Sequence, residues 1–244
     1  MSRARELADA GSKANFLDNV SADINTTYAP INNPAFTGTF SSEAIIGGLK
    51  SMQVFTSDGT WTKPSGIRTV KVFVTAGGGG GGATNTDDMA NGGGAGGTAI
   101  EIIDVTSISS VSVTVGSGGA GAPDGSPNSS LRGGTSSFGS YCSATGGDRS
   151  GPGWGIGGDG GTATGGDINI SGSDGIGGLI DNTGSHQAAG TGGASYWGQG
   201  GKGSSRGTNA GTAGSAYGSG GGGQADSSTS EAGAGGIVVV EEYI

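Results

Sequence analysis

The amino-acid sequence predicts a mainly β protein, in which a small antiparallel β-sheet module frames a glycine-rich array of polyglycine-II-like helices. Runs of alternating β-branched residues fall within residues 51–116 and at residues 237–244, and such runs are typical of strands. Glycine makes up 59 of the 244 residues, and 53 of these glycines lie between residues 77 and 236. Residues 117–236 carry only 13 large apolar or aromatic side chains, too few for a conventional hydrophobic core.

Residues 1–50 are predicted to form an N-terminal attachment or oligomerisation segment, short and helical at first and then extended. An apolar stripe is formed by Leu7, Ala8, Phe16, Leu17, Val20 and Ile24. Pro30 and Pro34 prevent the helix from continuing. Because such a segment buries little surface by itself, we expect the stripe to contact copies of itself or a partner. The alternative is a flexible leader. No apolar run approaches the roughly 20 residues of a membrane span, so we expect no membrane insertion.

The strands of the frame are expected within residues 51–116 and at the end of the chain. Residues 52–55 alternate and are followed by the turn SDGT, and residues 69–75 place Val70, Val72 and Val74 on one face. Two more alternating runs are TAIEIIDV and SVSVTVG, and the chain ends with IVVVEEYI. If this last strand pairs beside residues 69–75, the glycine-rich block is a set of excursions that leave and return to one sheet.

The glycine-rich block, residues 117–236, is expected to be ordered by its own backbone. Without Cβ atoms, polyglycine-II helices can approach closely enough to exchange N–H···O=C bonds, helped by weaker Cα–H···O contacts. Such an array would begin with the six glycines at residues 77–82. The alternative is a disordered block, because glycine has the largest backbone entropy to lose on folding. The flanking strands favour the ordered array, because they hold its ends.

Charge and composition exclude several classes of function. The net charge of −9 argues against nucleic acid or an anionic membrane surface as the partner. Cys142 and His186 are the only residues of their types, so a disulfide or a Cys/His metal cluster within the chain is excluded. A Ser-His-Asp triad could only use His186. We therefore expect no enzyme, no metal and no cofactor.

The sequence also lacks the dinucleotide-binding and calcium-binding motifs that glycine-rich sequences can resemble. Strand 70–75 followed by glycines resembles the start of a dinucleotide-binding fold, but the residues after Gly82 have no helical periodicity. Asp87 and Asp88 would also repel the phosphates. Calcium-binding β-rolls need aspartates at regular intervals along the sequence. The intervals between Asp159, Asp167, Asp174 and Asp181 are irregular.

Aromatic residues in polar, glycine-dense stretches are the candidates for recognition. Tyrosine and tryptophan among Ser, Gly and Asn are typical of binding loops, where rigid anchors are surrounded by adaptable polar groups. The alternative is that each aromatic covers the β module or fills a gap between glycine helices. The interrupting segments are expected to form loop tips. Their candidate receptor-binding residues are Trp154, His186, Tyr196, Trp197, Tyr217, Asp87, Asp88 and Arg132.

Several stretches carry a family resemblance: VFTSDGTWTKPSGIRTVKVFVTAGGGGGG, GGTSSFGS, SATGG and AGAGGIVVVEEYI. Together they resemble the glycine-rich C-terminal domain of bacteriophage tail-fibre proteins, over residues 30–244. A more distant likeness is to the tail-fibre tip adhesins of T-even-type phages, in which loops on a polyglycine-II sandwich contact the host receptor. This sequence lacks the Trp-rich N-terminal docking region of those adhesins, which suggests that it carries its own attachment segment.

The resemblance implies a virion protein that mediates host adsorption and is assembled in the host cytoplasm. It implies an outer-membrane protein or surface glycan as receptor, other tail proteins bound through the N-terminal segment, and a homotrimer. Two alternatives stay open. One is a structural fibre or virion decoration without receptor binding, and the less favoured one is a depolymerase of surface polysaccharide that uses paired carboxylates.

Overall fold

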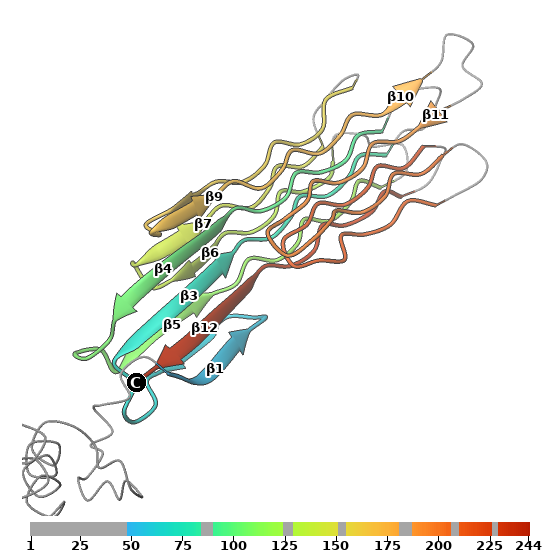
Figure 1. Ribbon diagram of the computed structural model, residues 1–244. Helices are drawn as coiled ribbons and strands as arrows, with labels where there is room; N and C mark the ends of the chain where they lie inside the picture. Colours follow the sequence, from blue (N-terminus) through green and yellow to red (C-terminus); the bar gives the residue numbers. More distant parts are fainter. Residues whose placement is uncertain are drawn as a thin grey trace, which may run out of the picture. The chain divides into compact units, whose positions relative to one another are not determined.

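The computed structural model of the protein (Figure 1) describes residues 48–83, 90–123, 129–150, 155–180, 187–205, 210–225 and 229–244. These residues form strands and extended segments and include no helix, which confirms the predicted mainly β class. Most of the expected attachment segment, residues 1–47, lies outside the described residues.

The first sheet contains four strands that the sequence predicted and one, at residues 168–170, that it did not. Its order is β1-β12-β3-β4-β9, and all neighbours are antiparallel. The pairing of the last strand beside residues 69–75 is confirmed, with Ile237 opposite Thr75 and Tyr243 opposite Thr69. The five strands are β1 (Leu49–Phe55), β3 (Thr69–Thr75), β4 (Thr98–Asp104), β9 (Ile168–Ile170) and β12 (Ile237–Tyr243).

A second sheet corrects the expectation of a single sheet module. Its order is β2-β5-β6-β7-β8, and three of its strands come from the glycine-rich region, where their short length hid them. They are too short to show an alternating pattern. The strands are β2 (Gly59–Thr62), β5 (Ser110–Thr114), β6 (Ser136–Phe138), β7 (Cys142–Ala144) and β8 (Ala163–Thr164). A separate two-stranded pair consists of β10 (Leu179–Ile180) and β11 (Gln187–Ala188).

The hydrophobic core lies between the two sheets. Val70, Val72 and Val74 all point into it, as their alternation predicted, while Phe73 lies on the opposite face of β3. The largest core side chain is Trp61, which is fully buried with its ring centroid 5.8 Å from that of Phe138. The two sheets therefore enclose a conventional apolar core, which the glycine-rich part of the chain lacks.

One carboxylate, Glu242, is fully buried at the edge of this core. It accepts hydrogen bonds from Trp61 Nε1 at 2.8 Å, Gln53 Nε2 at 2.6 Å and Ser51 Oγ at 2.5 Å. These donors, from β1 and β2, hold the two sheets together beside β12 and compensate for the lost hydration of the charge.

The rest of the described chain forms twelve extended segments that run out from the sheets and back (Figure 1). Odd-numbered segments lead away from the sheets and even-numbered ones return. In chain order, segments 1 to 12 are residues 76–83, 90–97, 115–123, 129–135, 145–150, 155–162, 171–178, 189–194, 199–205, 210–215, 219–225 and 229–236.

The backbone hydrogen bonds of segment 1 repeat every three residues. Successive N–H groups from Gly77 to Gly82 donate to segments 4, 12 and 2, and then to the same three segments again, at 2.8–3.0 Å. Its carbonyls accept in turn from segments 5, 3 and 11. A three-residue period without internal hydrogen bonds is the geometry of polyproline II, so segment 1 is a polyglycine-II helix with six neighbours.

Segments 2 and 11 also have six hydrogen-bonded neighbours, and segments 1, 2 and 11 bond to one another. All three are buried along their whole length. The other nine segments form a closed ring around this inner triangle, each bonded to the next in the order 3-4-5-6-7-8-9-10-12. The chain thus builds the ring almost in sequence order, and the array is packed hexagonally around a core made of backbone.

The six consecutive glycines follow from this inner position. A helix of three residues per turn that has neighbours on all sides has no direction left for a side chain. A Cβ atom at Gly79 would lie 2.5 Å from the Asp148 carbonyl carbon, and one at Gly80 would lie 2.6 Å from that of Ala120. The array therefore starts at residue 76, directly before the six glycines with which it was expected to begin. Its segments 1 and 2 lie within residues 51–116, which were expected to belong to the β frame.

Candidate functional site

The six gaps in the described chain all interrupt the array at the same end. Residues that flank different gaps bond to one another: Ser230 Oγ donates to the Gly81 carbonyl at 2.6 Å, and the Ala225 amide donates to Ser204 Oγ at 2.6 Å. β10 and β11 lie at this end, away from the two sheets (Figure 1). We call the residues that flank the six gaps the loop end of the array, and the opposite end the sheet end.

A surface depression of about 230 Å³ lies on the outer segments 4, 5 and 6. Its lining residues are Arg132, Asp148, Arg149, Ser150, Ile156, Gly157, Gly158 and Asp159. Two of these, Ser150 and Ile156, lie close to the gap 151–154, so the depression adjoins the loop end. Of the predicted candidate residues, Arg132 is the one that lines it.

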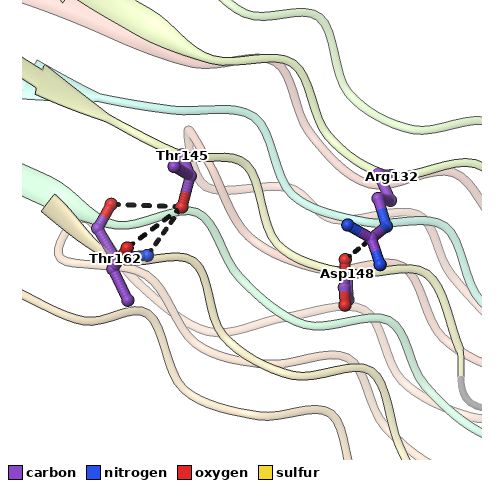
Figure 2. A network of polar contacts seen from close by, with 4 residues as sticks. All are labelled: Arg132, Thr145, Asp148 and Thr162. Atoms are coloured by element: carbon purple, nitrogen blue, oxygen red, sulfur yellow. Dashed lines mark hydrogen bonds and ion pairs between the residues drawn. The ribbon is translucent and has the colours of Figure 1, made fainter.

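Arg132 is held by a carboxylate from the neighbouring segment. Its Nε lies 2.6 Å from Asp148 Oδ1, and its side chain stays 73% exposed (Figure 2). The guanidinium therefore keeps its two terminal nitrogens available to a ligand, while the ion pair limits its freedom.

Segments 5 and 6 are joined one turn closer to the sheets by a pair of threonines (Figure 2). The Thr162 amide donates to Thr145 Oγ1 at 2.8 Å. Thr145 and Asp148 are three residues apart, which is one turn of a polyglycine-II helix, so both side chains project from the same face of segment 5. Further out, the Asp148 amide donates to the Asp159 carbonyl at 2.8 Å.

The floor of the depression consists of backbone. A Cβ atom at Gly158 would lie 2.8 Å from the Arg149 carbonyl carbon, and one at Gly157 would lie 2.8 Å from Gly175 Cα. Glycine at these positions therefore lets segment 6 pack directly against segments 5 and 7, and this closely packed backbone makes the depression rigid.

Charged groups remain free at the rim. Among the residues that the structure describes, the exposed Arg149 guanidinium and Asp159 carboxylate form no hydrogen bond or ion pair. Together with Arg132 and Asp148 they give the depression two positive and two negative groups. The depression therefore carries no net charge, whereas the chain carries −9.

Comparison with known proteins identifies the family of the chain. A family described as a glycine-rich domain matches residues 54–243, which is most of the chain and contains the array and both sheets except most of β1. The chain belongs to this glycine-rich domain family. No curated protein matches it.

The aromatic pair of this glycine-rich domain, Tyr196 and Trp197, does not lie at a loop tip, which corrects the placement expected for these two residues. The pair forms the turn between segments 8 and 9 at the sheet end. Trp197 Nε1 donates to Thr75 Oγ1 at 2.8 Å, and the rings of Tyr196 and Trp197 lie 6.1 and 6.2 Å from that of Phe73. The turn therefore packs against the outer face of β3.

Tyr217 lies in the neighbouring turn at the sheet end, between segments 10 and 11. Its carbonyl accepts a hydrogen bond from Ser195 Oγ at 2.7 Å, and Gly218 closes the turn with a φ of 74°. All three aromatic residues remain partly exposed to solvent, with exposed fractions of 46%, 38% and 44% for Tyr196, Trp197 and Tyr217. The side-chain contacts of Tyr196 and Trp197 support the packing alternative that the sequence left open.

The outer face of the first sheet is apolar across all five strands. Its central row consists of side chains that are paired in register: Val54, Val239, Phe73, Ile100 and Ile168. The two ends of the row, Val54 and Ile168, are exposed, and the adjacent Met52 and Ile102 are 49% and 59% exposed. An antiparallel sheet that is apolar on both faces is typical of a sheet that is covered on both sides.

The remaining predicted candidates, Trp154, His186, Asp87 and Asp88, lie outside the described residues, within three of the six gaps. Sequence reasoning missed Asp148, Arg149 and Asp159 as lining residues. The signal that could have found them is the charged DR pair that follows a glycine run, directly before a predicted loop.

Two findings bear on metal and membrane binding. Within the described ranges, no group of three or more His, Cys, Asp or Glu side chains could hold a metal ion. The same ranges contain no helix that could cross a membrane.

Proposed function

We propose that this glycine-rich domain is a bacteriophage tail-fibre protein that binds a bacterial surface receptor and so mediates adsorption to the host. The observation that carries the proposal is the loop end. Six connections, from residue 84 to residue 228, start and finish at one end of a scaffold whose stability comes from backbone packing. Such a scaffold tolerates changes in the connections, because the hydrogen bonds that stabilise it lie between the described segments.

The stretches shared with tail-fibre proteins support this proposal from the sequence side. The receptor would be an outer-membrane protein or a surface glycan, and the protein would act in the virion after assembly in the host cytoplasm. Several copies on one particle would multiply weak single contacts. Recognition would use the candidates at the loop end, namely Trp154, His186, Asp87, Asp88 and Arg132. The aromatics of the sheet end would serve packing.

Binding of the fluorescently labelled protein to a panel of intact bacterial strains tests the proposal. Trp154→Ala is expected to weaken saturable binding, because an aromatic anchor is lost from a loop-end connection. Tyr217→Ala is the matched control, because it removes an exposed aromatic from the sheet end. Absence of binding to every strain, including the host of the source virion, would favour a structural fibre protein. Equal loss in both variants would refute the assignment to the loop end.

We also propose that copies of the chain associate as a homotrimer, and that the N-terminal segment attaches the assembly to other tail proteins. The exposed apolar residues at the margins of the outer face of the first sheet support self-association, because burial of such a surface stabilises an interface; they are Met52, Val54, Ile102 and Ile168. Val54→Lys is expected to lower the molar mass measured by light scattering. Leu179→Lys, an equally polar change at the loop end, should leave the mass unchanged. A monomeric unmodified protein would contradict the proposal.

A further inference from the structure

We propose that the depression formed by Arg132, Asp148, Arg149 and Asp159 binds an uncharged saccharide. This inference rests on the proposed function and deepens it, because it selects a surface glycan over a protein as the receptor of this site. It is carried by the charge balance of the depression, its free polar groups and its backbone floor.

The polar groups of the depression match hydroxyl groups in particular. Guanidinium groups only donate hydrogen bonds and carboxylates only accept them, whereas each hydroxyl does both. Arg149 and Asp159, on adjacent segments, offer one donor group and one acceptor group that have no competing partner within the described part of the chain. Arg132 and Asp148 add a second donor–acceptor pair that their mutual contact already holds in place. Neighbouring hydroxyls of a sugar ring can therefore be bound by both pairs.

The charges disfavour the other ligand classes. An anionic ligand such as a phosphate or an acidic sugar would gain from the two arginines, but Asp148 and Asp159 would repel it. The overall charge of −9 would also slow its approach. A divalent cation would meet two carboxylates beside two guanidinium groups, and the described residues contain no metal-binding cluster.

A protein ligand is disfavoured by the lack of apolar contact. The depression offers a single large apolar side chain, Ile156, which is 59% exposed, and no aromatic anchor among its lining residues. Protein interfaces generally need a larger patch with buried aromatic anchors. One exposed aliphatic side chain beside several polar groups instead suits the C–H face of a sugar ring.

The floor supports a shallow, rigid site. Its backbone cannot move inward, because segments 5 and 6 bond to each other and to the inner segment 2. A rigid site loses little conformational entropy when a ligand binds, which matters for a ligand held by few contacts.

The test uses polysaccharide purified from the surface of a strain that the full-length protein binds, together with a panel of neutral and acidic bacterial polysaccharides. The variants are Arg149→Met and Asp159→Asn, which remove one charge each and keep most of the side-chain volume. The matched controls are Lys202→Met and Glu231→Gln, on outer segments away from the depression. Circular dichroism and melting temperature establish that every variant is folded.

The expected result is binding to a neutral polysaccharide that falls at least about tenfold in each depression variant and stays unchanged in both controls. Preference for acidic polysaccharides would overturn the ligand class. Binding to cells that survives periodate oxidation of their glycans, and survives both depression variants, would overturn the inference and leave the adhesin function intact. Binding to polysaccharide without binding to any cell would instead remove the proposed function and keep the site.

Discussion

A methyl group added inside the array should be far more damaging than one added at its surface. Gly233 and Gly235 provide a matched pair, because both lie in segment 12 and are two residues apart. A Cβ atom at Gly233 would lie 2.5 Å from the Gly78 carbonyl carbon and 2.7 Å from the Gly79 carbonyl oxygen, on inner segment 1. A Cβ atom at Gly235 would meet nothing nearer than 3.9 Å.

The cost of Gly233→Ala has two parts. Overpacking of a dense core costs about 1–3 kcal/mol. The segments must also move apart, which weakens the bonds from Gly233 N–H to the Gly119 carbonyl and from Gly78 N–H to the Ala234 carbonyl, both 2.9 Å long. Each bond contributes about 0.5–1.5 kcal/mol, so the total loss is about 3 kcal/mol. At about 2–4 °C per kcal/mol for a domain of this size, the melting temperature should fall by about 6–12 °C.

Gly235→Ala should have the opposite sign. Gly235 is not among the glycines with positive φ, so alanine fits its backbone conformation. The substitution then stabilises the protein by about 0.4–1 kcal/mol, because it reduces the conformational freedom of the unfolded chain. Thermal unfolding followed by circular dichroism measures both variants against the unmodified protein. Equal melting temperatures for the two variants would refute the packed backbone core.

Three further predictions concern single side chains of the two sheets and of the sheet end. Trp197→Phe should lower stability by about 0.5–1.5 kcal/mol in thermal unfolding, because Thr75 loses one hydrogen bond and keeps the one with Thr98, and it should leave cell binding unchanged. Glu242→Leu should destabilise the protein by about 1–3 kcal/mol, because the buried indole N–H loses its acceptor, and Glu242→Gln should cost less because it keeps an oxygen; an equal cost would contradict this role. Burial raises the pKa of the Cys142 thiol to about 12, so iodoacetamide should label it at pH 8 only after denaturation. The raised pKa of the Cys142 thiol contributes stability that is complete below the unfolded pKa of about 8.5 and is lost as the pH rises toward 12. The free energy of unfolding should therefore fall more steeply above pH 9 in the unmodified protein than in Cys142→Ala.

The strands of the frame could be predicted because their side chains alternate between a core and an outer face. The run at residues 69–75 shows this pattern completely, and the apolar end of the chain had to find an equally apolar partner. The short strands β6 to β8 could not be predicted in the same way. Two or three residues carry no period, and their place in the second sheet depends on neighbouring segments of the array.

The array could be predicted in kind but not in arrangement. Glycine runs indicate helices without side chains, and in retrospect unbroken runs mark the inner segments, as at residues 77–82 and 220–223. Ala95 interrupts the pattern in inner segment 2, and no contact in the structure explains why its methyl group is accommodated. The ring order of the outer segments depends on hydrogen bonds between distant residues, which leave no local pattern.

The candidate site shows the same limit. The sequence predicts Arg132 as a site residue, because it lies in a polar segment that interrupts the glycine runs. Its partner Asp148 and the neighbouring Asp159 could not be connected with it, because the three residues come from three different segments. The positions of Tyr196 and Trp197 were misjudged for a related reason. A polar, aromatic turn looks the same at either end of the array, and only the bond to Thr75 places it at the sheet end.

The backbone core should also give this protein an unusual response to temperature. Unfolding exposes apolar surface, which raises the heat capacity, and polar surface, which lowers it by about half as much per unit area. The three inner segments bury peptide groups and almost no apolar side chains. The heat-capacity increment per residue should therefore fall below the usual value of about 12–15 cal/mol/K. A smaller increment flattens the stability curve, so the array should keep nearly the same free energy of unfolding in the cold as in the warmth.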